Sequence, residues 1–228
     1  PKPLVTVGGA PLIEHAVRQC AAAGARDIVV VTGHDAVRVE AVLPPVAESL
    51  NIRISARRTE DWSRPNGHSV LTGAATMQGH YLLVMADHMF AHGLLERLVH
   101  DATTDDAVTL AADRRTNHPS IDPDDATWVE TDAKGRIRTI GKDIARFDAV
   151  DCGAFVAGPQ LASGIRHAIE RGRPGSLSDG MQVLADRGQA ATIDIEDAWW
   201  IDVDDMRTRD IAERHLASRI EPPKGRAA

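Results

Sequence analysis

The aspartate at position 87 directly follows the apolar stretch YLLVMA at 81–86, which has the composition of a buried strand. In open α/β sheets, ligands bind beyond the carboxyl ends of the strands, so a carboxylate at such an end is placed to hold a metal ion or to face a phosphate. Turns and helix N-caps favour aspartate as well. From spacing alone, a ligand role and a capping role for Asp87 are about equally supported.

A second acidic group lies in the segment WWIDVDD at 199–205. Strand alternation places Ile201 and Val203 on one face and Asp202 and Asp204 on the other, so that two carboxylates can point into one cleft. Asp204 or Asp205 is well placed to cap the helix that follows, which leaves Asp202 as the better ligand. Carboxylates from two separate strands, without a thiolate cluster, favour Mg²⁺ accompanied by substrate phosphates over zinc.

Cationic and imidazole side chains are the next candidates. Lys2 and Lys142 each lie next to the end of an expected strand, where a compact positive charge can neutralise phosphate, although a solvent-facing lysine is the more common outcome at such positions. His88 and His92 are four residues apart, a spacing that could share one helix face and bind zinc, but no HExxH motif accompanies them and exposed or capping histidines are favoured. The acidic run ending at Asp125 is interpreted as a solvated turn, because it lacks the central glycine and distant glutamate of a calcium loop.

The elements that must position these residues alternate between strand and helix over the first ~110 residues, which predicts a doubly wound α/β sheet. Expected strands there are 4–7, 27–32, 52–56 and 81–86, and expected helices are 11–24, 35–43, 69–77 and 93–101. Farther along, strands are expected at 107–112, 127–131, 136–140, 150–157, 191–195 and 199–203, and helices at 160–170, 179–187 and 205–218. The turn DAKG at 132–135 predicts a hairpin, and 221–228 reads as a frayed tail.

Composition excludes several classes of protein. The 228 residues carry 26 Lys and Arg against 33 Asp and Glu, and the net charge of −7 argues against binding to nucleic acid or to anionic lipid. The apolar runs are far shorter than the ~20 residues that a membrane span requires. Two cysteines give neither a disulfide framework nor a metal motif, which suits a reducing cytoplasm. The first residue is Pro1 and not methionine, so we expect the sequence to be part of a longer one.

Several segments, taken together and in order, resemble the nucleotidyltransferases of the sugar-phosphate type. These segments are PKPLVTVGGAPLIEHAV at the start, RPNGHSV, LLVMADHMF, IGKDIARFDAVDCGAF, SLSDGMQVLADRG and WWIDVDD. Within that family they look most like inositol-1-phosphate cytidylyltransferases, which are found alone or fused to a membrane phosphatidyltransferase. The resemblance covers nearly the whole chain.

The resemblance implies a Rossmann-like, doubly wound fold with a mixed, mainly parallel sheet, and an enzyme that transfers CMP from CTP to a phosphorylated alcohol, inositol-1-phosphate first of all, with release of pyrophosphate. Residues 1–220 would form one nucleotidyltransferase domain, with 1–112 binding the nucleotide and 113–220 binding the acceptor. Lys2 corresponds to the phosphate-contacting lysine, Asn66 and Gly67 lie where the base is read, and Asp87 and Asp202 match the two aspartates that bind Mg²⁺.

On the acceptor side, the resemblance assigns Lys142, Gly153 and Asp179 to the acceptor pocket, together with Asp151 and His88 as polar groups that would bind acceptor hydroxyls. A sugar-1-phosphate or phosphocholine is the alternative acceptor. A membrane enzyme that consumes the CDP-alcohol is the partner expected downstream, and the oligomeric state is left open.

This sequence departs from the family at its start. The family begins with a strand and a glycine-rich loop, LAAGxGxR in pattern, whose backbone amides and arginine cradle the triphosphate, and the present sequence starts after that position. We therefore expect the N-terminal strand and loop to be missing from the fold described below. If they are missing from the protein itself, a non-catalytic nucleotide-binding module is the alternative of another class.

Overall fold

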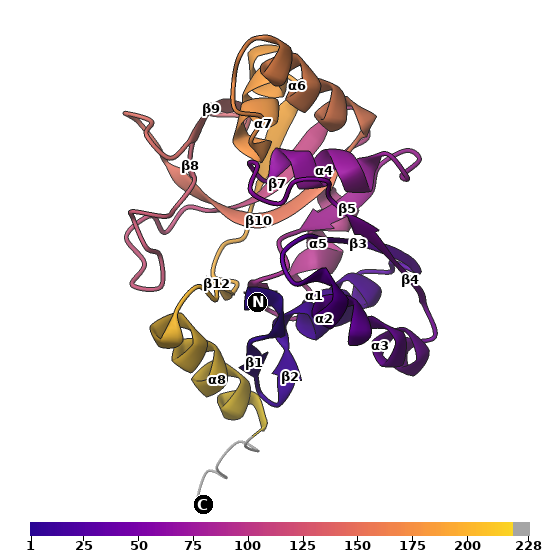
Figure 1. Ribbon diagram of the computed structural model, residues 1–228. Coiled ribbons are helices and arrows are strands. Elements are labelled where there is room, and N and C mark those ends of the chain that lie inside the picture. The colour runs from indigo at the N-terminus through magenta and orange to yellow at the C-terminus, as the bar shows by residue number, and fades with distance from the viewer. Residues whose placement is uncertain (221–228) are drawn as a thin grey trace, which may run out of the picture.

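The chain folds into helices packed around a mixed β-sheet, in a computed structural model that describes residues 1–220 (Figure 1). The helices are η1 (Lys2–Leu4, a 3-10 turn), α1 (Leu12–Ala22), α2 (Ala36–Ala41), α3 (Leu43–Leu50), α4 (Gly67–Ala74), α5 (Leu94–Asp101), α6 (Pro159–Glu170), α7 (Leu177–Asp186) and α8 (Met206–Ile220). The strands are β1 (Thr6–Val7), β2 (Ala10–Pro11), β3 (Asp27–Thr32), β4 (Arg53–Arg58), β5 (Tyr81–Val84), β6 (His88–Phe90), β7 (Val108–Asp113), β8 (Trp128–Thr131), β9 (Ile137–Gly141), β10 (Ala149–Ala157), β11 (Ala190–Asp194) and β12 (Trp200–Asp202). The tail expected at 221–228 lies outside the described residues.

The largest sheet has six strands and is built around β10. Its order is β11-β7-β10-β8-β9, with β5 also paired to β10. Strands β7 and β11 are parallel, whereas β10 runs antiparallel to β5, β7 and β8. The α/β class expected from the sequence is confirmed, and β10 makes the sheet mixed. The hairpin expected around the turn at 132–135 is confirmed by the antiparallel pairing of β8 with β9.

Helices cover both faces of this sheet, and successive residues of β7 pack against helices on opposite faces. Leu110 of β7 packs with the buried side chains of α6 and α7, whereas Ala111 packs with Leu95 and Leu98 of α5. Figure 1 shows α6, α7 and α4 together above the sheet. A strand buried on both faces is expected to be mainly apolar, and β7 is apolar apart from the buried Thr109 and Asp113.

The sheet is interrupted between β3 and β5. Within residues 1–220, β3 pairs only with β4, and β5 pairs only with β10. A cavity of about 560 Å³ lies between the two strands, with α1 and α4 forming the rest of its wall and apolar side chains such as Val29, Val31, Leu82 and Val84 lining it. Within the described residues, β3 and β5 therefore belong to separate sheets.

The N-terminal segment differs from the strand expected at 4–7. Residues 2–4 form the 3-10 turn η1, in which a proline occupies one of the first two positions, and only Thr6 and Val7 form a strand. That strand turns back on itself through Gly8 and Gly9, whose φ angles are +58° and +85°, and pairs with β2. Positive φ at both central residues is what a tight two-residue hairpin requires, so the glycine pair closes a small hairpin and not a strand-to-helix loop.

Two further predictions from the sequence differ from the structure. The helix expected at 35–43 is two helices, and α3 continues to Leu50 because its prolines occupy the first turn, where no backbone donor is lost. His88 was considered as part of a helix face with His92, but it begins the short strand β6. Of the helices in the described part of the chain, none is both long and apolar enough to cross a membrane.

Candidate active site

Two aspartates from distant parts of the sequence converge at the ends of their strands. Asp87 follows β5, and the chain then enters β6, which pairs antiparallel with β12 so that Asp202 lies directly opposite His88. Asp87, His88 and Asp202 each offer a ligand atom within 4.8 Å of the others. The structure therefore brings together the two carboxylates that the sequence singled out, close enough to share one ion.

The two carboxylates differ in their surroundings. Asp87 lies 3.2 Å from the Lys2 ammonium and 3.0 Å from His88 Nδ1. Burial opposes ionisation of Asp87, but these two partners outweigh it and hold the pKa of its carboxyl well below the usual range. Burial is the main reason that the pKa of Asp202 is raised, and the negative charges of Asp87 and Asp204 add to the effect.

One oxygen of Asp202 has no hydrogen-bond partner. Its Oδ1 atom is buried and accepts no hydrogen bond within the described chain, and it lies 3.6 Å from His88 Nδ1. A buried acceptor without a donor costs free energy, and a cation would remove that cost. Carboxylate oxygens are also the ligands that Mg²⁺ prefers, so the donor set of Asp87 and Asp202 fits this ion better than it fits zinc.

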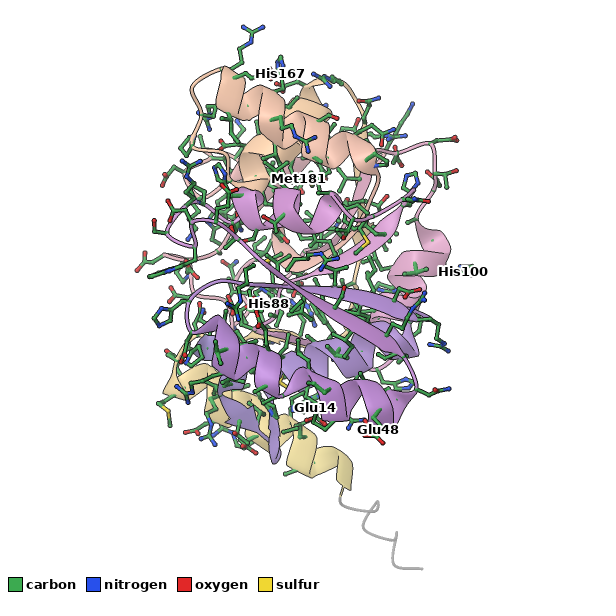
Figure 2. The ribbon with its side chains drawn as sticks, turned by 45° about the vertical axis from the view of Figure 1, so that its right-hand side comes forward. Glu14, Glu48, His88, His100, His167 and Met181 are labelled. Atoms are coloured by element: carbon green, nitrogen blue, oxygen red, sulfur yellow. The ribbon has the colours of Figure 1, made fainter. Side chains whose placement is uncertain are left out.

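His88 lies beside the two carboxylates and is largely shielded from solvent. Burial disfavours its charged form, but the hydrogen bond to Asp87 and the charges of Asp202 and Asp151 prevail and raise the pKa of the imidazole. Only 11% of its side chain is exposed. Figure 2 shows His88 in the interior, whereas His100 and His167 lie at the periphery.

Two lysines line the cleft, and each pairs with an aspartate. Lys2 bridges Asp87 and Asp204, and Lys142 pairs with Asp125. The sequence interpretation left Asp125 in a solvated turn; it is exposed, but it also lines the cleft. The sequence left the cap of the following helix to Asp204 or Asp205, and Asp205 takes that role by accepting from the Thr208 backbone N–H at 2.7 Å.

The cleft that these residues line is polar and has a volume of about 260 Å³. Its wall combines the residues of both expected halves of the site: Lys2, Asn66, Asp87, His88, Asp125, Lys142, Asp151, Gly153, Asp202, Asp204 and Arg207. The two lysines suit an anionic group of a substrate, and the carboxylates suit hydroxyl donors or a bound cation.

Asp151 and Gly153 shape the floor of the cleft beneath His88. The Gly153 N–H donates to Asp151 Oδ1 at 2.7 Å, and burial raises the pKa of Asp151 to about 6. Gly153 has φ +76°, and a Cβ at this position would lie 2.5 Å from His88 Cδ2. The imidazole therefore occupies space that only a glycine leaves free.

Three other residues expected at the site have structural partners. Asn66 lines the cleft, and its Oδ1 accepts from the Leu177 N–H at 2.9 Å, so it joins α4 to the start of α7. Gly67 does not line the cleft: a Cβ there would overlap the Gly175 carbonyl, so this glycine permits close packing of two backbones.

Asp179 also lies away from the cleft. Its side chain accepts from the Ser176 N–H at 2.9 Å while the Ser176 hydroxyl accepts from the Asp179 N–H, which is a capping box at the start of α7. The same carboxylate bonds Arg173 Nε at 2.9 Å. These contacts account for Asp179 as a helix cap, and the geometry gives no support to an acceptor role for it.

Comparison with known proteins places the chain in a family. The MobA-like NTP transferase domain matches residues 1–139. Two curated relatives are both named bifunctional IPC transferase and DIPP synthase. The one from Rubrobacter xylanophilus is 32% identical over 90% of this chain and 45% of its own length, and the one from Aquifex aeolicus is 25% identical over 95% of this chain and 47% of its own length. The chain thus spans about half the length of these relatives.

Solved structures share the fold. The inositol-1-phosphate CTP transferase from T. maritima superposes with a TM-score of 0.82 at 20% identity, covering 100% of this chain and 89% of that one. A putative glucose-1-phosphate thymidylyltransferase from Bacillus anthracis gives a TM-score of 0.80 at 18% identity, covering 98% and 89%. At these identities the likeness shows the fold alone. Because the family match spans more than half of the 228 residues, the chain belongs to the family of MobA-like NTP transferase domains.

Proposed function

We propose that this protein transfers CMP from CTP to the phosphate of inositol-1-phosphate. The observation that carries the proposal is the convergence of Asp87 and Asp202 in a polar cleft that two lysines also line. One buried oxygen of Asp202 accepts no hydrogen bond within the described residues. The family supports nucleotidyl transfer, and the names of the curated relatives and of the T. maritima enzyme support CTP and inositol phosphate as substrates.

The reaction joins two anions. An oxygen of the acceptor phosphate attacks the α-phosphorus of CTP, the bond from that phosphorus to the bridging oxygen breaks, and pyrophosphate leaves with the electron pair. The attacking oxygen is already deprotonated in a phosphate monoester dianion, so neither a general base nor a covalent intermediate is required. The work of the site is therefore to neutralise charge and to align the two phosphates.

The residues of the cleft divide this work. Asp87 and Asp202 would hold Mg²⁺, which neutralises phosphate charge and polarises the α-phosphoryl group when it is bound. With Asp87 engaged by the ion, Lys2 would keep its pair with Asp204 and would offer its other N–H donors to the triphosphate. Lys142 pairs with exposed Asp125 and would offer its other N–H donors to the acceptor phosphate.

The acceptor hydroxyls need hydrogen-bonding groups in the cleft. His88 and Asp151 are polar and partly buried, and both line the cleft. An acceptor that lacks a hydroxyl leaves such groups without partners, which favours a polyol over phosphocholine. We further propose that the CDP-inositol product is consumed by a CDP-alcohol phosphatidyltransferase in a membrane.

A panel of substrates tests the proposal, using the protein expressed with its natural termini. Pyrophosphate release is measured with CTP, UTP, ATP and GTP, each combined with inositol-1-phosphate, glucose-1-phosphate or phosphocholine, with and without Mg²⁺. We expect Mg²⁺-dependent release from CTP with inositol-1-phosphate above all other pairs. Faster turnover with glucose-1-phosphate or phosphocholine would show that inositol-1-phosphate is not the preferred acceptor. No turnover with any pair would refute the enzyme and favour a nucleotide-binding module.

A further inference from the structure

Asp113, at the end of β7, is a buried carboxylate that does not line the cleft. Its side chain is 1% exposed. It accepts from the Arg115 N–H at 2.8 Å, from Arg115 Nε at 2.9 Å and from Trp200 Nε1 at 2.7 Å. Burial opposes its ionisation, but the hydrogen bonds from Arg115 and Trp200 prevail and lower its pKa. A charge is buried at this depth only where its partners are well ordered.

The partners of Asp113 lead directly to the site. Trp200 is the first residue of β12 and lies two positions before Asp202, so the two side chains share one face of the strand. The indole ring stacks on the His88 imidazole, with the ring centres 5.9 Å apart and the planes at 20°. His88 in turn bonds Asp87. One chain of contacts thus joins Asp113 to both candidate metal ligands.

Arg115 adds a second attachment of the same segment. While its guanidinium pairs with Asp113, its Nη2 also donates to the Ala198 carbonyl at 2.7 Å, two residues before Trp200. The backbone that enters β12 and the indole that follows are therefore both fixed to the end of β7. Strand β12 has only three residues, and in the described chain its only strand partner is β6, so these side-chain contacts add anchorage that the sheet does not supply.

We propose that Asp113 is a positioning residue for the active site. Asp113 fixes the position of β12 through its contacts with Trp200 Nε1 and Arg115. It thereby fixes the distance between Asp202 and Asp87. Through the indole face, it also holds the His88 ring in the orientation in which Nδ1 meets Asp87. Only the kcat measurement in the test below rests on the proposed function. The geometry of the carboxylates and of His88 can be measured without turnover.

The test uses Trp200→Phe, which keeps an aromatic face on His88 and removes the indole N–H. Trp128→Phe is the matched control, because Trp128 is also 8% exposed and its ring stacks on Phe147, outside the cleft. Binding of Mn²⁺ alone, followed by electron paramagnetic resonance, reports the carboxylate pair. We expect Trp200→Phe to weaken Mn²⁺ binding by about three- to tenfold, the range of one net hydrogen bond, and Trp128→Phe to leave it within twofold.

The second part of the test combines Asp113→Asn with Trp200→Phe in a double-mutant cycle. If the two residues act as one device, Trp200→Phe has little further effect on Mn²⁺ binding in the Asp113→Asn background. In steady-state assays the positioning role lowers kcat while KM for CTP changes less, because the carboxylates act on the reacting phosphates. Equal Mn²⁺ affinity and equal kcat in Trp200→Phe and Trp128→Phe would overturn the proposal even if Asp113→Asn failed to fold.

Failure of the proposed function has a different signature. If the unaltered protein neither binds Mn²⁺ nor turns over CTP, the nucleotidyl-transfer proposal fails. The side-chain ¹⁵N resonances of His88 then still decide the positioning role, since they need no metal. A change at His88 in Trp200→Phe but not in Trp128→Phe supports the role, and unchanged His88 resonances in both variants refute it.

Discussion

Replacing Gly153 by alanine tests whether the packing of His88 against this glycine matters for the site. The φ angle of +76° costs a residue with a Cβ about 1–2 kcal/mol. In addition, the new Cβ would lie 2.5 Å from His88 Cδ2 and 2.8 Å from Nε2, so the imidazole must move away. The ring is confined by Asp87 and by the Trp200 face, and overpacking of this kind costs roughly 1–3 kcal/mol more.

Gly172 provides the matched control. It has φ +80°, and a Cβ there would meet nothing within 4 Å. The backbone penalty and the entropic effect on the unfolded chain are therefore shared by Gly172→Ala and Gly153→Ala, and the difference between them isolates the contact with His88. We expect unfolding free energies reduced by about 1–2 kcal/mol for Gly172→Ala and by about 2–5 kcal/mol for Gly153→Ala.

Urea denaturation gives the two unfolding free energies, and pyrophosphate release gives the turnover. Gly153→Ala is expected to lose at least tenfold in kcat, because a displaced His88 no longer holds Asp87, whereas Gly172→Ala keeps the normal rate at temperatures where both are folded. Equal destabilisation in the two variants, together with normal turnover in Gly153→Ala, would refute the reasoning.

Three more predictions concern charge and capping. Asp87→Asn and Asp202→Asn should each lower kcat by orders of magnitude and abolish the rise in melting temperature caused by Mg²⁺, whereas the exposed substitution Asp105→Asn should do neither; thermal melts with and without the ion decide this. The pKa of Asp151 is about 6 in the folded protein against 3.8 for an unperturbed aspartate, so the folded protein binds more protons between these pH values than the unfolded chain does. The free energy of unfolding therefore falls by up to about 3 kcal/mol as the pH rises through that range. Asp151→Asn should flatten this loss in urea titrations at pH 4.5 and 7.5, and an unchanged pH dependence would contradict the assignment. Ser176→Ala removes half of the capping box of α7 and should cost about 1 kcal/mol without changing kcat, so a large kcat effect would mean that the start of α7 touches substrate.

The order of the elements and the most informative acidic residue could be predicted from the sequence, because both depend on local patterns. A continuous apolar run identified β5, and a mainly apolar segment identified β7. Alternation in the segment before α8 put Asp202 on the strand face that points away from buried Ile201. The rule that ligands gather at the carboxyl ends of strands then selected Asp87. Each of these inferences uses a property of a few adjacent residues, which is what one sequence contains.

Other features depended on contacts between residues that are far apart in the chain. The pairing of β6 with β12 sets Asp202 beside His88 across more than one hundred residues, and register of this kind has no local signature. The same holds for Asp113 and Trp200, which bond each other across 87 positions. Asp179 matched a family position, yet in the structure its side chain accepts from the backbone N–H groups of Gly175 and Ser176, just before α7. The sequence by itself determined which residues stand at the strand ends, and the tertiary structure decided which of those ends meet, because strand pairing is fixed by packing of the whole sheet.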